Sequence, residues 1–95
     1  MKVFLVSIRP FTGPDSEPMV FGTAVNAVKY IEDLRNSNGM GPFDADEAVY
    51  DLNNFGSAQI EVCGDRLHGS VFAVAREAEV DKYYIDKTKE NDNGN

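Results

Sequence analysis

The 95 residues, 42% hydrophobic and 11% aromatic, are enough for one self-sufficient domain and leave no room for a second. The net charge of −7 argues against direct binding to nucleic acid, because phosphate backbones are bound through Lys and Arg. The single cysteine excludes an internal disulfide framework, and no apolar run approaches the roughly 20 residues of a membrane span. We therefore expect a cytoplasmic protein whose N-terminal apolar run is a strand and not a signal peptide.

The N-terminal part of the chain has the pattern of strands. Residues 2–8 (KVFLVSI) place apolar side chains on both faces of a strand, which indicates an interior position in a sheet. Residues 11–18 (FTGPDSEP) hold two prolines and a glycine, so they predict an exposed loop. Residues 19–21 (MVF) are expected to form a short strand after this loop.

A helix is predicted from about residue 24 to residue 35. Thr23 is a suitable N-cap, and the glycines and proline of NSNGMGP at 36–42 end the helix. The apolar positions recur at helical spacing and gather on one side of this helix. They are Ala24, Ala27, Val28, Ile31 and Leu34.

The stretch GPFDADEAVYDLNNFG at 41–56 predicts a second helix. Asp44 and Glu47 have the spacing of a capping box, in which each side chain accepts a backbone amide at the helix start. Gly56 suits a left-handed residue at the helix end. A helical projection places five apolar residues towards the core. They are Ala45, Ala48, Val49, Leu52 and Phe55.

The C-terminal part returns to strand patterns. Residues 70–78 form a longer predicted strand, and GDRLHG at 64–69 is predicted to be the hairpin connection before it. Residues 80–86 are expected to extend that strand or to add a short edge strand, and the tail 88–95 is expected to be disordered. Residues 58–63 (AQIEVC) alternate between apolar and other side chains, as a strand does. This alternation directs three side chains outward, namely Gln59, Glu61 and Cys63.

Together these patterns predict an α+β domain over residues 1–87, in the order β-(β)-α-α-β-β. The expected architecture is a small antiparallel or mixed sheet of three to five strands, with the two helices packed on one face.

Few residues in the chain carry catalytic or metal-binding chemistry. Cys63, Asp65 and His68 lie within six residues, but they share one hairpin, and no second element orients the histidine or supplies oxyanion donors. A solvated turn beside a half-buried thiol is the expected structure. The acidic run at 44–51 lacks the glycine and the residue order of a calcium loop. We therefore predict no catalytic residue, no bound metal and no cofactor.

The charge is distributed unevenly along the chain. Between Glu32 and Asp65 there are eight acidic residues and one base, Arg35, whereas the rest of the chain is balanced. The helix dipole accounts for acids at the start of the second helix but not for Asp51. A field of one sign speeds encounter with a basic partner, although it also serves solubility. The predicted partner-binding residues are Asp44, Asp46, Glu47, Tyr50 and Asp51, with Glu32 and Asp33 nearby if the helices lie side by side.

Three hypotheses about function follow. The first is a non-enzymatic module that binds a basic surface of another protein. Such a surface is commonly a groove that binds nucleic acid, so a nucleic-acid-binding protein is the expected partner. Small acidic chains without catalytic chemistry are typical of phage and mobile-element inhibitors, such as anti-restriction or anti-CRISPR proteins. The second is an accessory or assembly subunit, including a homodimer, that acts through an apolar sheet edge or face. The third, an enzyme using Cys63 and His68, has the least support.

Overall fold

The computed structural model describes residues 1–65 and 69–79 of the chain. The expected strand at 80–86, the expected tail at 88–95 and His68 lie outside the described residues. The elements within them follow the predicted order, with boundaries that differ by a few residues. They are β1 (Lys2–Arg9), β2 (Met19–Phe21), α1 (Ala24–Ser37), α2 (Ala45–Phe55), β3 (Ser57–Asp65) and β4 (Gly69–Glu79).

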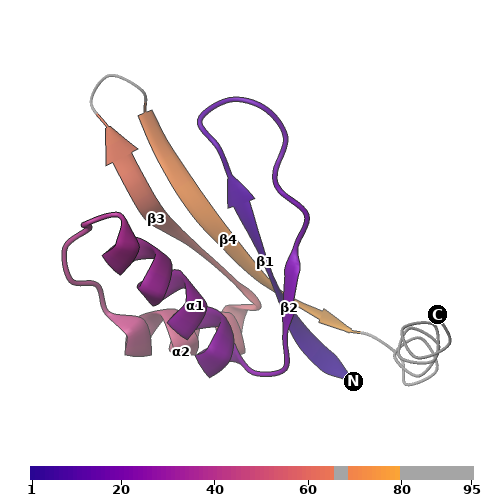
Figure 1. The fold of residues 1–95 in the computed structure, drawn as a ribbon. Coiled ribbons are helices and arrows are strands. Elements are labelled where there is room, and N and C mark those ends of the chain that lie inside the picture. The colour runs from indigo at the N-terminus through magenta and orange to yellow at the C-terminus, as the bar shows by residue number, and fades with distance from the viewer. Residues whose placement is uncertain (66–68, 80–95) are drawn as a thin grey trace, which may run out of the picture.

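The four strands form one antiparallel sheet in the order β2-β1-β4-β3. Both helices lie on the same face of this sheet, and the upper end of the sheet in Figure 1 extends beyond them. This arrangement confirms the predicted α+β fold with two helices on one face. Strand β1 has a neighbour on each side, as its two apolar faces predict, whereas β3 is an edge strand among the described residues.

The core lies between the two helices and the covered face of the sheet. The central strands contribute Phe4 and Val6 from β1 and the small residues Ala73 and Ala75 from β4. Small side chains on β4 leave volume for larger ones from the helices, in keeping with the close packing of protein interiors. The largest of the fully buried side chains are Ile31, Leu52, Val6, Val28 and Val62.

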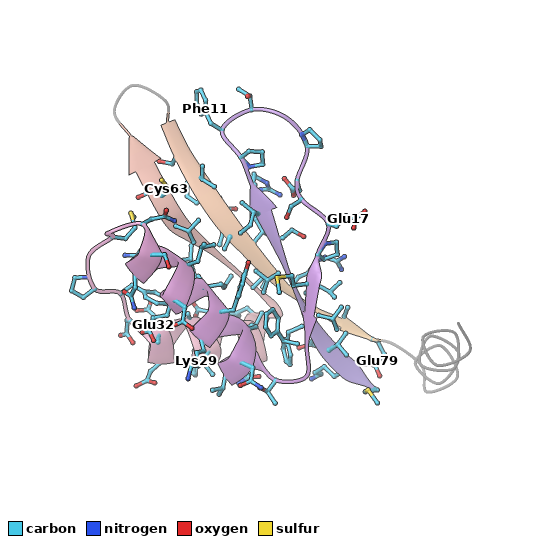
Figure 2. The ribbon with its side chains drawn as sticks, in the orientation of Figure 1. Phe11, Glu17, Lys29, Glu32, Cys63 and Glu79 are labelled. Carbon is cyan, nitrogen blue, oxygen red and sulfur yellow. The ribbon has the colours of Figure 1, made fainter. Side chains whose placement is uncertain are left out.

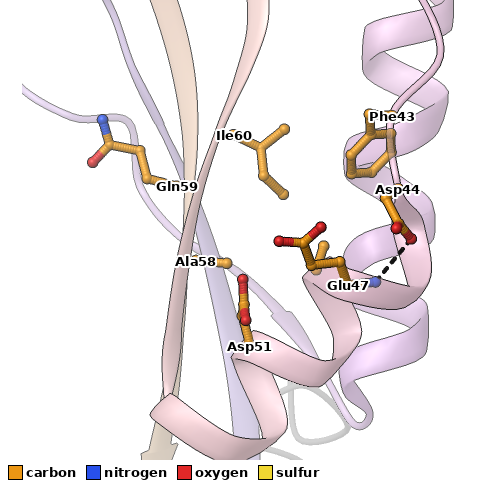
Figure 3. A pocket seen from close by; sticks show the side chains of 8 residues that line it. Phe43, Asp44, Glu47, Asp51, Ala58, Gln59 and Ile60 are labelled. Atoms are coloured by element: carbon orange, nitrogen blue, oxygen red, sulfur yellow. Dashed lines mark hydrogen bonds between the residues drawn. The ribbon is translucent and has the colours of Figure 1, made fainter.

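The helix ends follow their local sequence signals. Thr23 Oγ1 accepts a hydrogen bond from the amide of Asn26 at 3.1 Å, and Asp44 Oδ1 accepts one from the amide of Glu47 at 3.0 Å. Gly56 ends α2 in the left-handed region with a φ of 80°, where a side chain would be strained. The capping box is only half formed, because the Glu47 carboxylate extends towards β3 instead of back to Asp44 (Figure 3).

The prediction that Phe55 belongs to the core is wrong, since 72% of this residue is exposed. A helical projection shows which side of the helix a residue faces, but not whether another element covers the residue there. Phe55 is the last residue of α2, and the chain turns away at Gly56 before another helical turn can cover the ring. The ring instead packs edge-on against Tyr50, with centroids 6.2 Å apart.

The prediction that Cys63 faces outward together with Gln59 is also wrong. A β-bulge between Glu61 and Cys63 shifts the register, so Cys63 pairs with Val71, which packs against the core. A bulge inserts one extra residue into a strand and so reverses the alternation beyond it. Cys63 therefore shares a face with the core residues, on the part of the sheet that extends past the helices (Figure 2).

Candidate partner-binding groove

A groove of about 210 Å³ separates α2 from β3, and we call it the acidic groove. The left-handed turn at Gly56 joins the two elements directly, so the chain returns alongside the flank of α2 that carries the carboxylates. The groove is lined by Phe43, Asp44, Glu47, Ala48, Asp51, Ala58, Gln59 and Ile60.

Three carboxylates border this groove. Asp44, Glu47 and Asp51 lie three and four residues apart, which places them along one flank of a helix. In Figure 3 the Glu47 side chain extends from α2 towards Ile60, and the Asp51 side chain extends towards Ala58. The Glu47 and Asp51 carboxylates therefore face a partly apolar strand, whereas the Asp44 carboxylate caps the start of α2.

No described cation neutralises these carboxylates. The ion pairs within residues 1–65 and 69–79 join the Met1 ammonium to Glu79, Lys2 to Glu77 and Arg9 to Asp15, and none of them involves a groove carboxylate. In the last pair, a hydrogen bond from the Arg9 guanidinium to Asp15, together with charge attraction, raises the pKa of Arg9. The charge imbalance in the sequence thus persists as a local negative field at the acidic groove.

Arg35, the only base between Glu32 and Asp65, is bonded to backbone carbonyls and not to carboxylates. Its Nη1 donates to the carbonyl oxygen of Glu61 at 2.5 Å, and its Nη2 donates to that of Gly41 at 2.8 Å. The guanidinium carbon also lies 5.0 Å from the centroid of the Phe43 ring. Arg35 thereby ties β3 and the loop before α2 to the end of α1.

The burial of Arg35, which is only 8% exposed, was not anticipated by the sequence analysis. The signal was nevertheless present, because Arg35 stands four residues after Ile31 and seven after Val28, on the buried stripe of α1. A base on an apolar stripe requires buried acceptors, and the carbonyls of Glu61 and Gly41 provide them.

The other predicted partner-binding residues lie outside the acidic groove. Asp46 and Tyr50 are exposed on the outer side of α2, where Tyr50 packs against the exposed Phe55. On α1, Asp33 is exposed opposite the buried stripe, and Glu32 is half-buried beside it (Figure 2). The structure therefore gathers three of the seven predicted residues around the groove and leaves four on neighbouring surfaces.

The described residues offer little for catalysis or metal binding. Cys63 is a half-buried free thiol on β3, and the His68 imidazole proposed to act with it lies outside the described residues. Within residues 1–65 and 69–79, no group of three or more His, Cys, Asp or Glu side chains is placed to hold a metal ion. No helix in the same ranges is long and apolar enough to cross a membrane.

No protein-family model matches this sequence, and neither a curated protein nor a solved structure matches it. In the part of the chain that the structure describes, the acidic groove brings three carboxylates together without a paired cation, and this chemistry is the basis for a proposal about function.

Proposed function

We propose that this protein is a non-enzymatic binding module that offers the acidic groove to a basic surface of a protein partner. One observation carries the proposal: Asp44, Glu47 and Asp51 border a single groove, and no described Lys or Arg pairs with them. A field of one sign at a concave site steers an oppositely charged partner and raises its rate of association.

The fold gains little from the Asp51 carboxylate, and from the Glu47 carboxylate it gains only the interaction with the helix dipole at the start of α2. Asp44 caps α2, but neither Glu47 nor Asp51 has a hydrogen bond or ion pair from its carboxylate to a described residue. Like charges spaced three or four residues apart cost a helix about 0.2–0.5 kcal/mol per pair. A partner's Lys or Arg side chains would convert that repulsion into attraction, so the arrangement is better suited to a complex than to the isolated chain.

The exposed aromatic pair on α2 supports the same proposal. Tyr50 is 59% exposed and packs against Phe55, so two rings stand free on the outer side of the helix that carries the groove acids. Exposed Tyr and Phe side chains are enriched at protein interfaces, where they anchor binding at low entropic cost. The proposed interface therefore combines the acidic groove with an apolar anchor beside it.

Basic protein surfaces are commonly nucleic-acid-binding surfaces, which places such proteins first among the proposed partners. In that case the carboxylates compete with phosphate groups for a few Lys or Arg side chains. Three carboxylates suit a local patch and are too few to imitate an extended phosphate track. A phage or mobile-element inhibitor of host nucleic-acid machinery is the narrower form of this proposal.

The test compares the wild-type protein with a groove variant carrying Asp44→Asn, Glu47→Lys and Asp51→Lys. Asn preserves the helix cap while removing the charge, so α2 should remain folded. Both proteins are immobilised, exposed to a host lysate, and their captured proteins are quantified by mass spectrometry. The proposal expects basic proteins on the wild-type chain that are lost from the groove variant.

A matched control carries Asp15→Asn, Glu17→Lys and Glu79→Lys. It has the same net charge as the groove variant, but its changes lie in the β1–β2 loop and at the end of β4, away from β3 (Figure 2). The control should capture what the wild type captures. Equal losses in both variants would show that overall charge, and not the acidic groove, decides binding, and the proposal would be abandoned.

A second candidate function, an accessory or assembly subunit, is favoured by the sheet face opposite the helices. Phe4 and Val6 face the core, so Leu5 between them faces the other way, beside Val20, which is 65% exposed. Half-buried Phe72 and Val74 of β4 lie on the same face. Sedimentation velocity should then show a dimer that persists at high salt and is lost on Val74→Lys.

A further inference from the structure

We infer that the partner enters the acidic groove with an extended, basic segment that pairs with the outer edge of β3 as an added antiparallel strand. This inference rests on the proposed function and specifies the shape and sequence pattern of the partner. A sheet edge binds an added strand through its backbone groups, and pockets for alternate side chains provide selectivity.

The ladder between β3 and β4 shows which backbone groups of β3 point outward. The amide of Glu77 donates to the carbonyl oxygen of Gly56 at 2.8 Å, so Gly56 faces β4. In an antiparallel ladder this direction alternates, so Ala58 and Ile60 also face β4, whereas Ser57 and Gln59 face the outer edge. The outward carbonyl of Glu61, which accepts from Arg35, agrees with this alternation.

Only part of this edge is covered within the described chain. Arg35 and Asn38 donate to the carbonyl oxygens of Glu61 and Val62, at 2.5 and 3.0 Å. No described residue forms a hydrogen bond with the outward backbone groups of Ser57 or Gln59. Proteins usually protect sheet edges against added strands, but here the protection stops where the acidic groove begins.

The groove also exposes the backbone of this part of β3. Gln59 lines the groove, yet its side chain points away from α2 in Figure 3. The part of Gln59 that borders the groove is therefore its main chain, between the half-buried side chains of Ala58 and Ile60. A segment paired with this edge would lie beside the Glu47 and Asp51 carboxylates.

The spacing of the carboxylates matches that of an added strand. Side chains two residues apart on one face of a strand are separated by about 6.8 Å. Four residues along a helix, the separation of Glu47 and Asp51, rise by about 6 Å. The partner's Lys or Arg residues at alternate positions would each meet one of these carboxylates. The expected pattern is therefore basic-x-basic, and two adjacent basic residues would place one of them on the wrong face.

Three peptides test this inference, each with blocked ends and nine residues of alternating threonine and lysine. The first is unmodified. In an antiparallel pair, residues opposite Ser57 and Gln59 turn their amides towards β3, whereas residues opposite Ala58 and Ile60 turn theirs away. The lysines of the peptide lie opposite Ala58 and Ile60, where their side chains point to the side of Glu47 and Asp51, and the threonines lie opposite Ser57 and Gln59. The second peptide is therefore N-methylated at its interior threonines, and the third at its interior lysines.

Binding is measured by NMR titration of the full-length protein. The unmodified peptide should shift the amides of Ser57 and Gln59, methylation of the threonines should weaken binding by about tenfold or more, and methylation of the lysines should change it by less than about threefold. On the protein side, Gln59→Pro removes an outward amide that the fold does not use, so it should abolish binding while the spectrum stays native-like.

Equal affinities of the two methylated peptides, or no peptide binding at all, would overturn strand addition. A peptide of the same composition with its lysines adjacent gives a further check, since binding as tight as that of the alternating peptide would also overturn it. These failures leave the proposed function standing if the groove variant still loses the captured proteins. Peptide binding that the groove variant retains in full would instead count against the groove itself.

Discussion

Arg35 donates a hydrogen bond of 2.5 Å to the carbonyl oxygen of Glu61, and this contact ties the last turn of α1 to the bulged part of β3. The guanidinium also lies over Phe43, at the end of the acidic groove. The single base of the acidic middle of the chain thus has an architectural role, and no described cation pairs with the groove carboxylates.

Replacing Arg35 with Ala should lower the free energy of unfolding by about 2–4 kcal/mol, because two charge-assisted hydrogen bonds are lost and two carbonyls are left without donors. Urea denaturation followed by circular dichroism measures the change. Lys29→Ala is the control, since Lys29 is exposed on the same helix and its loss should cost less than about 0.5 kcal/mol. A similar small effect for Arg35→Ala would contradict its structural role.

Changes at Asp44 and Glu47 should separate capping from charge. Asp44→Ala should destabilise the protein by about 1 kcal/mol through loss of the cap on α2, whereas Asp44→Asn should be nearly neutral. Glu47→Ala should cost less than Asp44→Ala, because the Glu47 carboxylate caps nothing and loses only its interaction with the helix dipole. Thermal unfolding of the three variants checks this order. A loss for Glu47→Ala as large as that for Asp44→Ala would indicate a complete capping box in solution.

Phe55 and Leu52 should respond very differently to truncation. Leu52 is fully buried, so Leu52→Ala should cost about 2–5 kcal/mol, the usual range for a core leucine. Phe55→Ala should cost less than about 1 kcal/mol, because the exposed ring loses only its contact with Tyr50. Chemical denaturation of both variants provides the comparison. A core-like loss at Phe55 would mean that the ring is covered in solution.

Gly56 should not tolerate a side chain. Its φ of 80° lies in the left-handed region, so Gly56→Ala should cost about 1–2 kcal/mol although nothing lies near its missing Cβ. Gly22→Ala is the matched control, because Gly22 also has open space but no positive φ. That change should be neutral or slightly stabilising. Equal midpoints in urea for the two variants would argue against a strained turn between α2 and β3.

Binding of the alternating lysine peptide should depend steeply on salt. Raising NaCl from 0.1 to 1 M shortens the Debye length from about 10 Å to about 3 Å, so attraction of the peptide lysines to the Glu47 and Asp51 carboxylates should be largely screened. We expect the affinity to fall by about tenfold or more, and the residual affinity of the groove variant to change little. NMR titrations at both salt concentrations check this, and a salt-independent affinity would point to an apolar contact instead.

Features that depend on near neighbours in the chain could be predicted from the sequence. Thr23 and Asp44 bond to amides three residues on, and Gly56 ends α2 through its own backbone conformation. Hydrophobic periodicity likewise predicted the order of strands and helices and one covered face of the sheet, because both periods are properties of a single element. The clustering of charge was also visible from the order of the residues along the chain.

The contacts between those elements could not be predicted, because they depend on how the whole chain packs. The strand order, the bulge that turns Cys63 towards the core side, the buried Arg35 and the exposed Phe55 all depend on residues distant in sequence or on where an element ends. The same holds for the acidic groove. A helical wheel places Glu47 and Asp51 on one flank, but the packing of α2 on the sheet puts them beside an edge of β3 that no described strand covers. Long-range burial and strand pairing fix how separate elements lie together.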